Sequence, residues 1–217
     1  MQTLTEKVYR LAPPDGIFAE SVVRNLLPSA SDTARKQFIY RAVSNGEILR
    51  LKPGLYCLAE AYRKTHPHPF VVAGLLHSPS HISLESALSY YGLIPEAVHG
   101  VTSVTDRRSR TFRTPLGDFS FIRVPADEPR AGVRHINIDN QGWIFIAGPM
   151  RAIADLIYLR KGVFWKKDGL RFLTDSLRIE EDDLHKIPLD DYEEVFSSLR
   201  NKRTKTYLKG LRSELER

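Results

Sequence analysis

The chain of 217 residues contains only one cysteine, Cys57, so it cannot form an intramolecular disulfide. It also lacks a long apolar run. Stretches such as FVVAGLL at 70–76 and WIFIA at 143–147 are far shorter than the roughly 20 residues that span a bilayer. The first residues do not show the charged, apolar and small-residue order of a secretory signal. We therefore expect a cytoplasmic protein with no membrane partner.

The sequence also lacks the common catalytic and cofactor motifs. It has no Walker A loop, no Gly-x-Gly-x-x-Gly, no His-Glu-x-x-His and no Cys/His spacing typical of zinc sites. His66 and His68 alternate as some metal ligands do, but the prolines around them favour a surface linker. Asp118 and Glu128 lack the accompanying Glu-x-Lys expected of a magnesium-dependent nuclease. The expectation is a protein without enzymatic activity, catalytic residues, metal or cofactor.

The charge balance favours an anionic partner. The formal net charge is +6, and residues 1–65 hold ten Lys/Arg against six Asp/Glu, whereas residues 66–150 hold seven of each. In the C-terminal part the signs separate, with eight acids and one base at 180–194 and six bases without an acid at 200–212. Such runs are most often solvated helix faces. The N-terminal surplus is therefore the stronger binding signal.

The first sixty residues have the pattern of three helices followed by a β-hairpin. Apolar residues recur at helical spacing, and Pro- or Gly-containing stretches separate the segments. The expected elements are helices at 1–12, 17–27 and 32–46 and strands at 47–51 and 55–58, joined by a turn at 52–54. Ser31 or Asp32 can cap the third helix, and Asn45-Gly46 suits its end. Pro53-Gly54 suits the turn of the hairpin.

The third helix is expected to present a polar, basic face to solvent. Its apolar residues, Ala34, Phe38, Ile39, Ala42 and Val43, are assigned to the core. The sequence of two helices, a basic helix and a hairpin is the order of a winged helix-turn-helix, whose third helix reads bases in the major groove. Arg50 and Lys52 would lie on the wing, close to the phosphates. The predicted DNA-binding residues are Thr33, Arg35, Lys36, Gln37, Tyr40, Arg41, Arg50 and Lys52. The alternatives are a helical subdomain with an ordinary basic surface and a winged helix used for protein contacts.

Beyond a linker at 66–69, the pattern changes to mixed helices and strands. Helices are expected at 70–77, 83–91 and 151–159 and through the rest of the chain, with strands at 101–105, 110–124 (a hairpin), 135–139 and 142–148. Ser83 suits the N-cap of its helix. The fold class is therefore α+β, with a winged helix-turn-helix domain at 1–65 and a mixed α/β domain at 70–217.

Two basic clusters lie in this second part. Four arginines fall within seven residues: Arg107, Arg108, Arg110 and Arg113. They suit a second phosphate-binding surface or a docking patch for an acidic partner, and an exposed hairpin with solvated charge is an equal alternative. The run NKRTKTYLKGLR offers the same choice, and its Tyr207, Leu208 and Leu211 indicate one packed helix face.

Three stretches resemble a known family. They are LKPGLYCLAE at 51–60, HISLESALSYYGL at 81–93 and WIFIAGPMRAIADLIYLRKG at 143–162. They are similar to the AbiEi family, the antitoxin and transcriptional regulator of type IV toxin–antitoxin systems. The chain departs from the family pattern at the wing, where Lys52-Pro53-Gly54 replaces an Arg-Gly pair, and at Met150 to Ile153.

The resemblance implies a sequence-specific DNA-binding autorepressor that acts on its own operon promoter, at inverted repeats. It further implies an antitoxin that counteracts a nucleotidyltransferase-like toxin encoded beside it, in phage abortive infection. The alternative is an antitoxin that binds its toxin directly, with DNA binding secondary. The salt dependence of binding distinguishes these two alternatives. Affinity for DNA falls steeply as the salt concentration rises, whereas the affinity of an apolar protein interface changes less.

Overall fold

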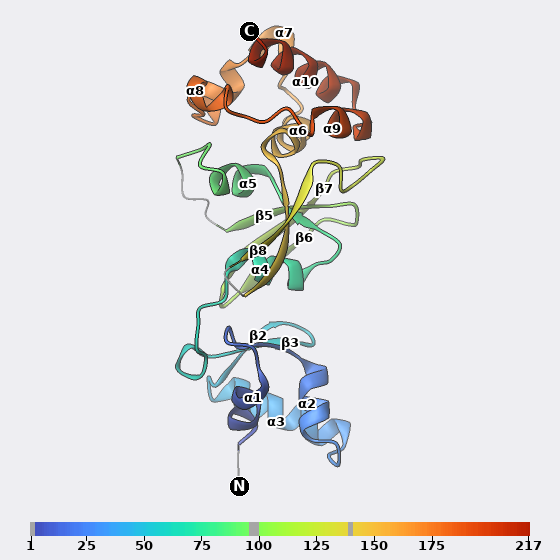
Figure 1. Ribbon diagram of the computed structural model, residues 1–217. Coiled ribbons are helices and arrows are strands. Elements are labelled where there is room, and N and C mark those ends of the chain that lie inside the picture. Colours follow the sequence, from blue (N-terminus) through green and yellow to red (C-terminus); the bar gives the residue numbers. More distant parts are fainter. Residues whose placement is uncertain (1–2, 96–99, 139–140) are drawn as a thin grey trace.

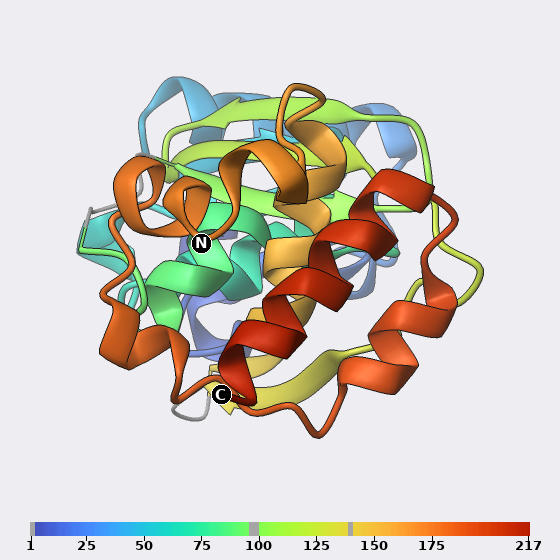
Figure 2. The same ribbon diagram turned by 90° about the horizontal axis from the view of Figure 1, so that it is seen from above.

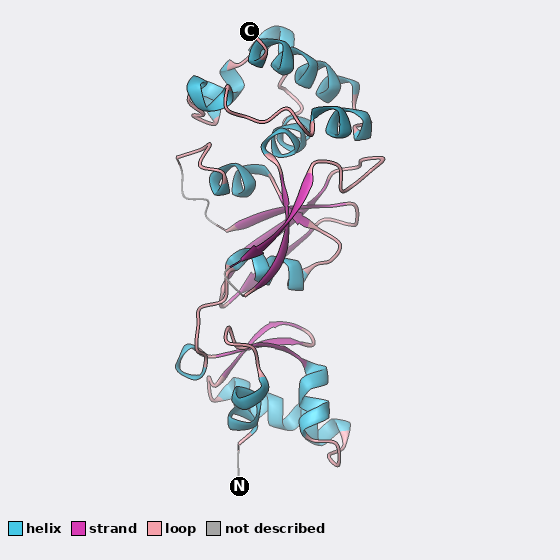
Figure 3. Cartoon of the chain, in the orientation of Figure 1, coloured by secondary structure: helices cyan, strands magenta, loops and turns pink. Residues whose placement is uncertain are grey.

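The computed structural model describes residues 3–95, 100–138 and 141–217. The expected α+β class is confirmed, because helices accompany two separate sheets of three and six strands. Figures 1 and 3 show these sheets one above the other, with helices below, between and above them. The expected helix from Met1 and the expected strand to Asp139 each include residues outside the described ranges. Within those ranges, no helix is long and apolar enough to cross a membrane.

The N-terminal segment builds the smaller sheet. Its elements are α1 (Leu4–Leu11), β1 (Ile17–Ala19), α2 (Glu20–Leu26), α3 (Asp32–Ser44), β2 (Ile48–Lys52) and β3 (Leu55–Leu58). The strands are antiparallel in the order β1-β3-β2. The expected helix at 17–27 is wrong in its first three residues, which form β1. Ile17 pairs with Cys57 there, a long-range contact that overrides a local helical pattern.

Both faces of this small sheet are buried. One face packs against α1, α2 and α3 through Phe18, Ile48, Tyr56 and Leu58. The opposite face joins the core of the rest of the chain through Ile17, Leu51, Leu55 and Cys57. Successive side chains of a strand point to opposite faces, so all four residues of β3 are buried. The β2–β3 hairpin therefore lies between the N-terminal helices and the following segment (Figure 1).

The larger sheet has the order β6-β7-β5-β4-β9-β8 and mixes parallel with antiparallel pairs. Its strands are β4 (His81–Ile82), β5 (Val101–Thr105), β6 (Arg110–Thr114), β7 (Gly117–Arg123), β8 (Val133–Ile138) and β9 (Gly142–Ala147). The turn η1 (Glu60–Tyr62) precedes helix α4 (Pro69–Leu76). This helix lies on the side of the larger sheet that is turned toward the smaller sheet. Helices α5 (Leu84–Tyr90) and α6 (Pro149–Leu159) cover the other side (Figure 1).

The C-terminal part is helical, as expected, but in short pieces. These are α7 (Trp165–Asp168), a π-helical turn (Phe172–Ser176), α8 (Glu181–Leu184), α9 (Tyr192–Ser198) and α10 (Lys202–Leu215). Figure 2 shows α10 crossing above α6. The predicted packed face of α10 is confirmed, because Tyr207, Leu208 and Leu211 are all fully buried.

A buried ionic network joins α6 to the larger sheet. Asp155 and Arg151 are fully buried on α6, and Arg151 Nε donates to Asp155 Oδ1 at 3.0 Å. Arg151 Nη1 also donates to the carbonyl of Ala131 at 2.9 Å. Ser83 Oγ donates to Asp155 Oδ2 at 2.7 Å. Ser83 is the N-cap residue of α5, as predicted, but its side chain makes no cap hydrogen bond, because the hydroxyl donates to Asp155 instead.

The network stabilises the fold at neutral pH more than at acidic pH. Burial by itself raises the pKa of Asp155, but Arg151, His81 and Ser83 lower that pKa overall. Burial lowers the pKa of His81, whose Nε2 lies 3.6 Å from Asp155 Oδ2. In both cases the unfolded state binds protons more readily. The contribution to stability is therefore present at neutral pH and is lost on acidification, first below the ordinary histidine pKa of about 6.5 and then below about 3.9.

Removal of Arg151 should be strongly destabilising, because it leaves the Asp155 carboxylate buried without its partner. We expect Arg151→Ala to lower the free energy of unfolding by about 3–5 kcal/mol, measured by urea denaturation. Arg160→Ala is the control, since that exposed arginine pairs with Glu85 at 3.3 Å and should change stability by at most about 1 kcal/mol. Equal losses in the two variants would contradict the role of the network.

Candidate nucleic-acid interface

Helix α3 is fixed by its cap and by a narrow apolar contact. Ser31 Oγ accepts a hydrogen bond from the Ala34 amide at 3.2 Å, so Ser31 is the N-cap. Ile39 and Ala42 are buried against the N-terminal core. Phe38, which was assigned to the core, is instead 37% exposed. With only this narrow apolar stripe engaged, most of the helix surface remains in solvent.

The solvent side of α3 carries the predicted polar face. Thr33, Lys36, Gln37, Tyr40 and Arg41 are all exposed, Tyr40 to 73%. Their spacing of three and four residues puts them on adjacent rows of one helix surface. Within the described part of the chain, no hydrogen bond or ion pair engages the side chains of Lys36, Gln37, Tyr40 or Arg41. These groups are therefore available to an external partner.

Arg35 has a different role from the one predicted. Its side chain is only 15% exposed, and Nη1 donates to the carbonyls of Leu27 and Ala30. Its Nη2 donates to Asp32, and this hydrogen bond and charge lower the pKa of the Asp32 carboxyl. The guanidinium thus ties the turn between α2 and α3 to the start of α3. Arg35 positions the helix and is left out of the proposed contacts with DNA.

A β-bulge separates the two cations predicted on the hairpin. Arg50 pairs with Tyr56, and in the pleat it lies on the face that carries the N-terminal helices. The pairing register then shifts between Arg50 and Lys52. Without that shift, residues i and i+2 would point to the same face; the extra residue directs Lys52 to the opposite face. Arg50 is exposed on the face of the sheet that carries α1, α2 and α3, whereas Lys52 points toward the following segment.

The predicted phosphate contact of Lys52 is replaced by an internal one. Lys52 Nζ donates to the carbonyls of Leu75 and Leu76 at 2.7 and 2.8 Å, at the C-terminal end of α4. A cation is stabilised there by the free carbonyls and by the helix dipole. Burial, and then the nearby Arg110, lower the pKa of Lys52. Lys52 therefore fastens the hairpin to α4.

The second basic cluster is exposed along β6 and the turn before it. Arg107, Arg108, Arg110 and Arg113 all face solvent. Burial lowers the pKa of His77, and the nearby positive charges of Arg110 and Arg107 lower this pKa further. Arg113 lies farther along β6, where Asp118 of β7 is its cross-strand partner. The structure thus places Arg110 near Lys52 of the β2–β3 hairpin and Arg113 opposite an acidic residue.

One cation that the sequence did not single out lies beside α3. Arg24, in the last turn of α2, is exposed and is close enough to Asp32 for its charge to lower the pKa of that carboxyl. It therefore adds positive charge at the start of α3. Its place in the last turn of the helix before α3 was the available signal, but without the fold nothing distinguished it from other surface arginines.

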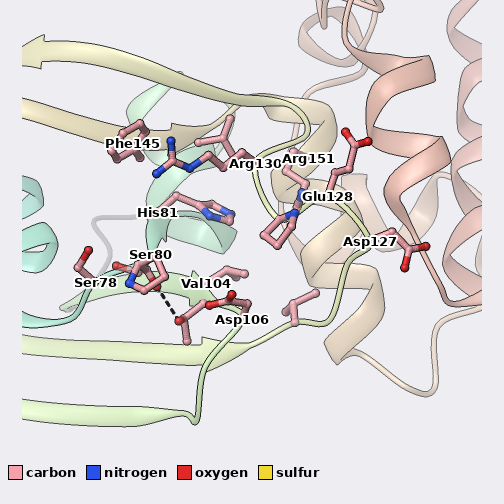
Figure 4. A pocket seen from close by; sticks show the side chains of 15 residues that line it. Ser78, Ser80, His81, Val104, Asp106, Asp127, Glu128, Arg130, Phe145 and Arg151 are labelled. Atoms are coloured by element: carbon pink, nitrogen blue, oxygen red, sulfur yellow. Dashed lines mark hydrogen bonds between the residues drawn. The ribbon is translucent and has the colours of Figure 1, made fainter.

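A separate cavity of about 530 Å³ opens beside the buried ionic network. Its lining includes basic side chains, among them Arg130 and Arg151, and three carboxylates, Asp106, Asp127 and Glu128 (Figure 4). Two of these charges are already paired, Arg151 with Asp155 and Asp127 with Arg200 at 2.6 Å. Among the residues described, no group of three His, Cys, Asp or Glu could hold a metal ion. The unengaged face of α3 is therefore the stronger candidate site.

No protein-family model and no curated protein matches this chain. The resemblance to the AbiEi family accordingly stays a prediction from the sequence.

Arg35 and Lys36 are adjacent in the sequence but should respond differently to the same change. Arg35→Met removes three hydrogen bonds from a largely buried guanidinium, and we expect a loss of about 2 kcal/mol of unfolding free energy. Lys36→Met changes an exposed side chain and should stay within about 0.5 kcal/mol of the wild type. Urea denaturation of the two variants measures this, and equal stabilities would refute the positioning role of Arg35.

Proposed function

We propose that the protein is a sequence-specific DNA-binding autorepressor whose N-terminal segment acts as a winged helix-turn-helix. One observation carries the proposal: in the described part of the chain, no hydrogen bond or ion pair engages four exposed side chains of α3, those of Lys36, Gln37, Tyr40 and Arg41. The element order α1-β1-α2-α3-β2-β3 and the antiparallel sheet are in keeping with it. At 13 residues, α3 is about 20 Å long, a length suited to lie in a major groove.

The residue types on α3 suggest distinct roles. Gln37 can form a bidentate contact with adenine, and Arg41 with guanine. Lys36 supplies a phosphate contact, and Thr33 and Tyr40 offer hydroxyl and apolar contacts to base edges. Arg50, on the same side of the hairpin, and Arg24, at the start of α3, add phosphate contacts at the two ends of the interface. Compared with the set predicted from the sequence, the proposed contact residues leave out Arg35 and Lys52 and add Arg24.

Binding to a labelled duplex from the upstream region of the gene tests the proposal. We expect salt-sensitive binding that prefers this duplex over random DNA. Lys36→Ala with Arg41→Ala should weaken it roughly 100-fold and reduce the slope of log K against log salt by about 1, because Lys36 contacts a phosphate and Arg41 a base. Measurement is by fluorescence anisotropy across a salt series.

The matched control removes two exposed lysines at the opposite end of the chain. Lys166→Ala with Lys167→Ala lowers the net charge by the same amount, but these lysines lie on α7. This variant should bind the duplex like the wild type. Equal weakening of both double variants would mean that only net charge matters. No preference of the wild type over random DNA would refute the autorepressor.

The antitoxin role is proposed on the AbiEi resemblance alone. The expected partner is a nucleotidyltransferase-like toxin encoded in the same operon. If neutralisation does not depend on DNA, the Lys36→Ala/Arg41→Ala variant should still restore growth when it is co-expressed with the toxin from an unrelated promoter. Loss of rescue by this stable variant would instead tie neutralisation to DNA binding. Failure of the wild type to restore growth would refute the antitoxin role and leave the DNA-binding proposal unaffected.

A further inference from the structure

An exposed column of stacked rings lies on β8 and β9, apart from the α3 face. Trp143 and Phe145 alternate along β9 with the buried Ile144 and Ile146, so the pleat directs both rings to one side. The His135 ring of β8 stacks on both, with centroids 4.4 Å from Trp143 and 4.7 Å from Phe145. The interplanar angles are 27° and 17°, so His135 lies between them, nearly parallel to each.

The two ends of the column differ. At one end the Arg130 guanidinium lies over the Phe145 ring, 4.7 Å from its centroid. At the other end Trp143 is 61% exposed although His135 covers one face of its indole. The exposed area therefore belongs to the second face and the ring edges. An open indole face next to an existing stack is a surface on which a further aromatic ring can add.

The charges around the column favour an anionic ligand. Neither β8 nor β9 contains an Asp or Glu, and the column itself includes the Arg130 guanidinium. The loop before β8 does carry Asp127 and Glu128. Figure 4 shows the Arg130 guanidinium directed to Phe145, whereas Asp127 and Glu128 lie farther to the right, away from that ring. A ligand that runs along the column thus meets a cation at its far end.

The size of the open surface favours a nucleobase over a protein. A stable protein interface covers about 800 Å² on each partner, far more than one indole and the half-exposed Leu75 beside it provide. A base needs only one ring face. Trp143 also borders a hollow of about 470 Å³, lined by Phe70 and Leu75, which is within the usual volume of a small-ligand site.

We infer that the Trp143–His135–Phe145–Arg130 column is a binding site for single-stranded nucleic acid. An unpaired base stacks on the open face of Trp143, and the sugar-phosphate chain follows the column toward Arg130. The column is separate from α3, so the inference is independent of the duplex that α3 reads.

The test measures binding of fluorescein-labelled oligothymidine of about 12 nucleotides to the full chain at low salt. All variants carry Lys36→Ala and Arg41→Ala, which removes the contribution of α3. Trp143→Ala and Trp143→Leu should each weaken binding about tenfold, whereas Trp143→Phe, which keeps an aromatic face, should retain most of it. Tyr62→Ala, at another exposed aromatic residue, is the control and should bind like its parent.

A direct readout uses the tryptophans themselves. The chain contains two, so Trp165→Phe leaves Trp143 as the single indole fluorophore. Oligothymidine should quench its emission, and an abasic oligomer of the same length should not, because only a base can stack. Wild-type affinity in Trp143→Ala, retained binding in Trp143→Leu or equal quenching by the abasic oligomer would each overturn the inference. It would also be overturned if Trp143→Ala abolished only self-association, since the column would then be an interface between two copies.

Discussion

Burial of both faces of the β1-β3-β2 sheet is the constraint on which the rest of the structure depends. One face holds α1, α2 and α3 in place, and the other joins the core of the following segment. Because of the bulge between them, Arg50 and Lys52 point to opposite faces of the sheet. Arg50 lies on the face that carries α1, α2 and α3, and Lys52 reaches the C-terminal end of α4. The β2–β3 hairpin is thus held against the following segment. The exposed side of α3 is the part of the N-terminal segment that can contact a large partner.

The start of α3 is also fixed by a charged side chain with internal partners. Arg35 uses its donors on the carbonyls of the preceding turn, which fixes the direction in which α3 leaves α2. In the larger unit Asp155 and Arg151 of α6 have an equivalent function, since Asp155 accepts from Ser83 and Arg151 donates to the carbonyl of Ala131. Charged side chains with internal partners therefore hold the elements in place. The exposed polar side chains of α3 and the open face of the Trp143 indole remain for recognition.

Much of the fold followed from local patterns. The period of the apolar residues, the Ser31 cap and the Asn45-Gly46 end predicted α3, and alternation with Pro53-Gly54 predicted the hairpin. The polar set on α3 was also predictable, since helical spacing determines which residues share a surface. Three features were not. The strand character of Ile17 depends on Cys57, forty residues later in the chain. The side to which Lys52 points depends on a bulge that strand alternation cannot reveal. The hydroxyl of Ser83 is recruited by Asp155, which no local pattern indicates.

The central claim is that α3, and not the tip of the β2–β3 hairpin, meets DNA. Directed hydroxyl-radical cleavage tests it, because Cys57 is buried and a new surface cysteine can carry an iron chelate by itself. The chelate is attached at Thr33→Cys, at the exposed start of α3, or at Pro53→Cys, at the exposed hairpin tip. The account predicts strong, localised cleavage of the upstream duplex from position 33 and near-background cleavage from position 53. Strong cleavage from position 53 with little from position 33 would contradict it.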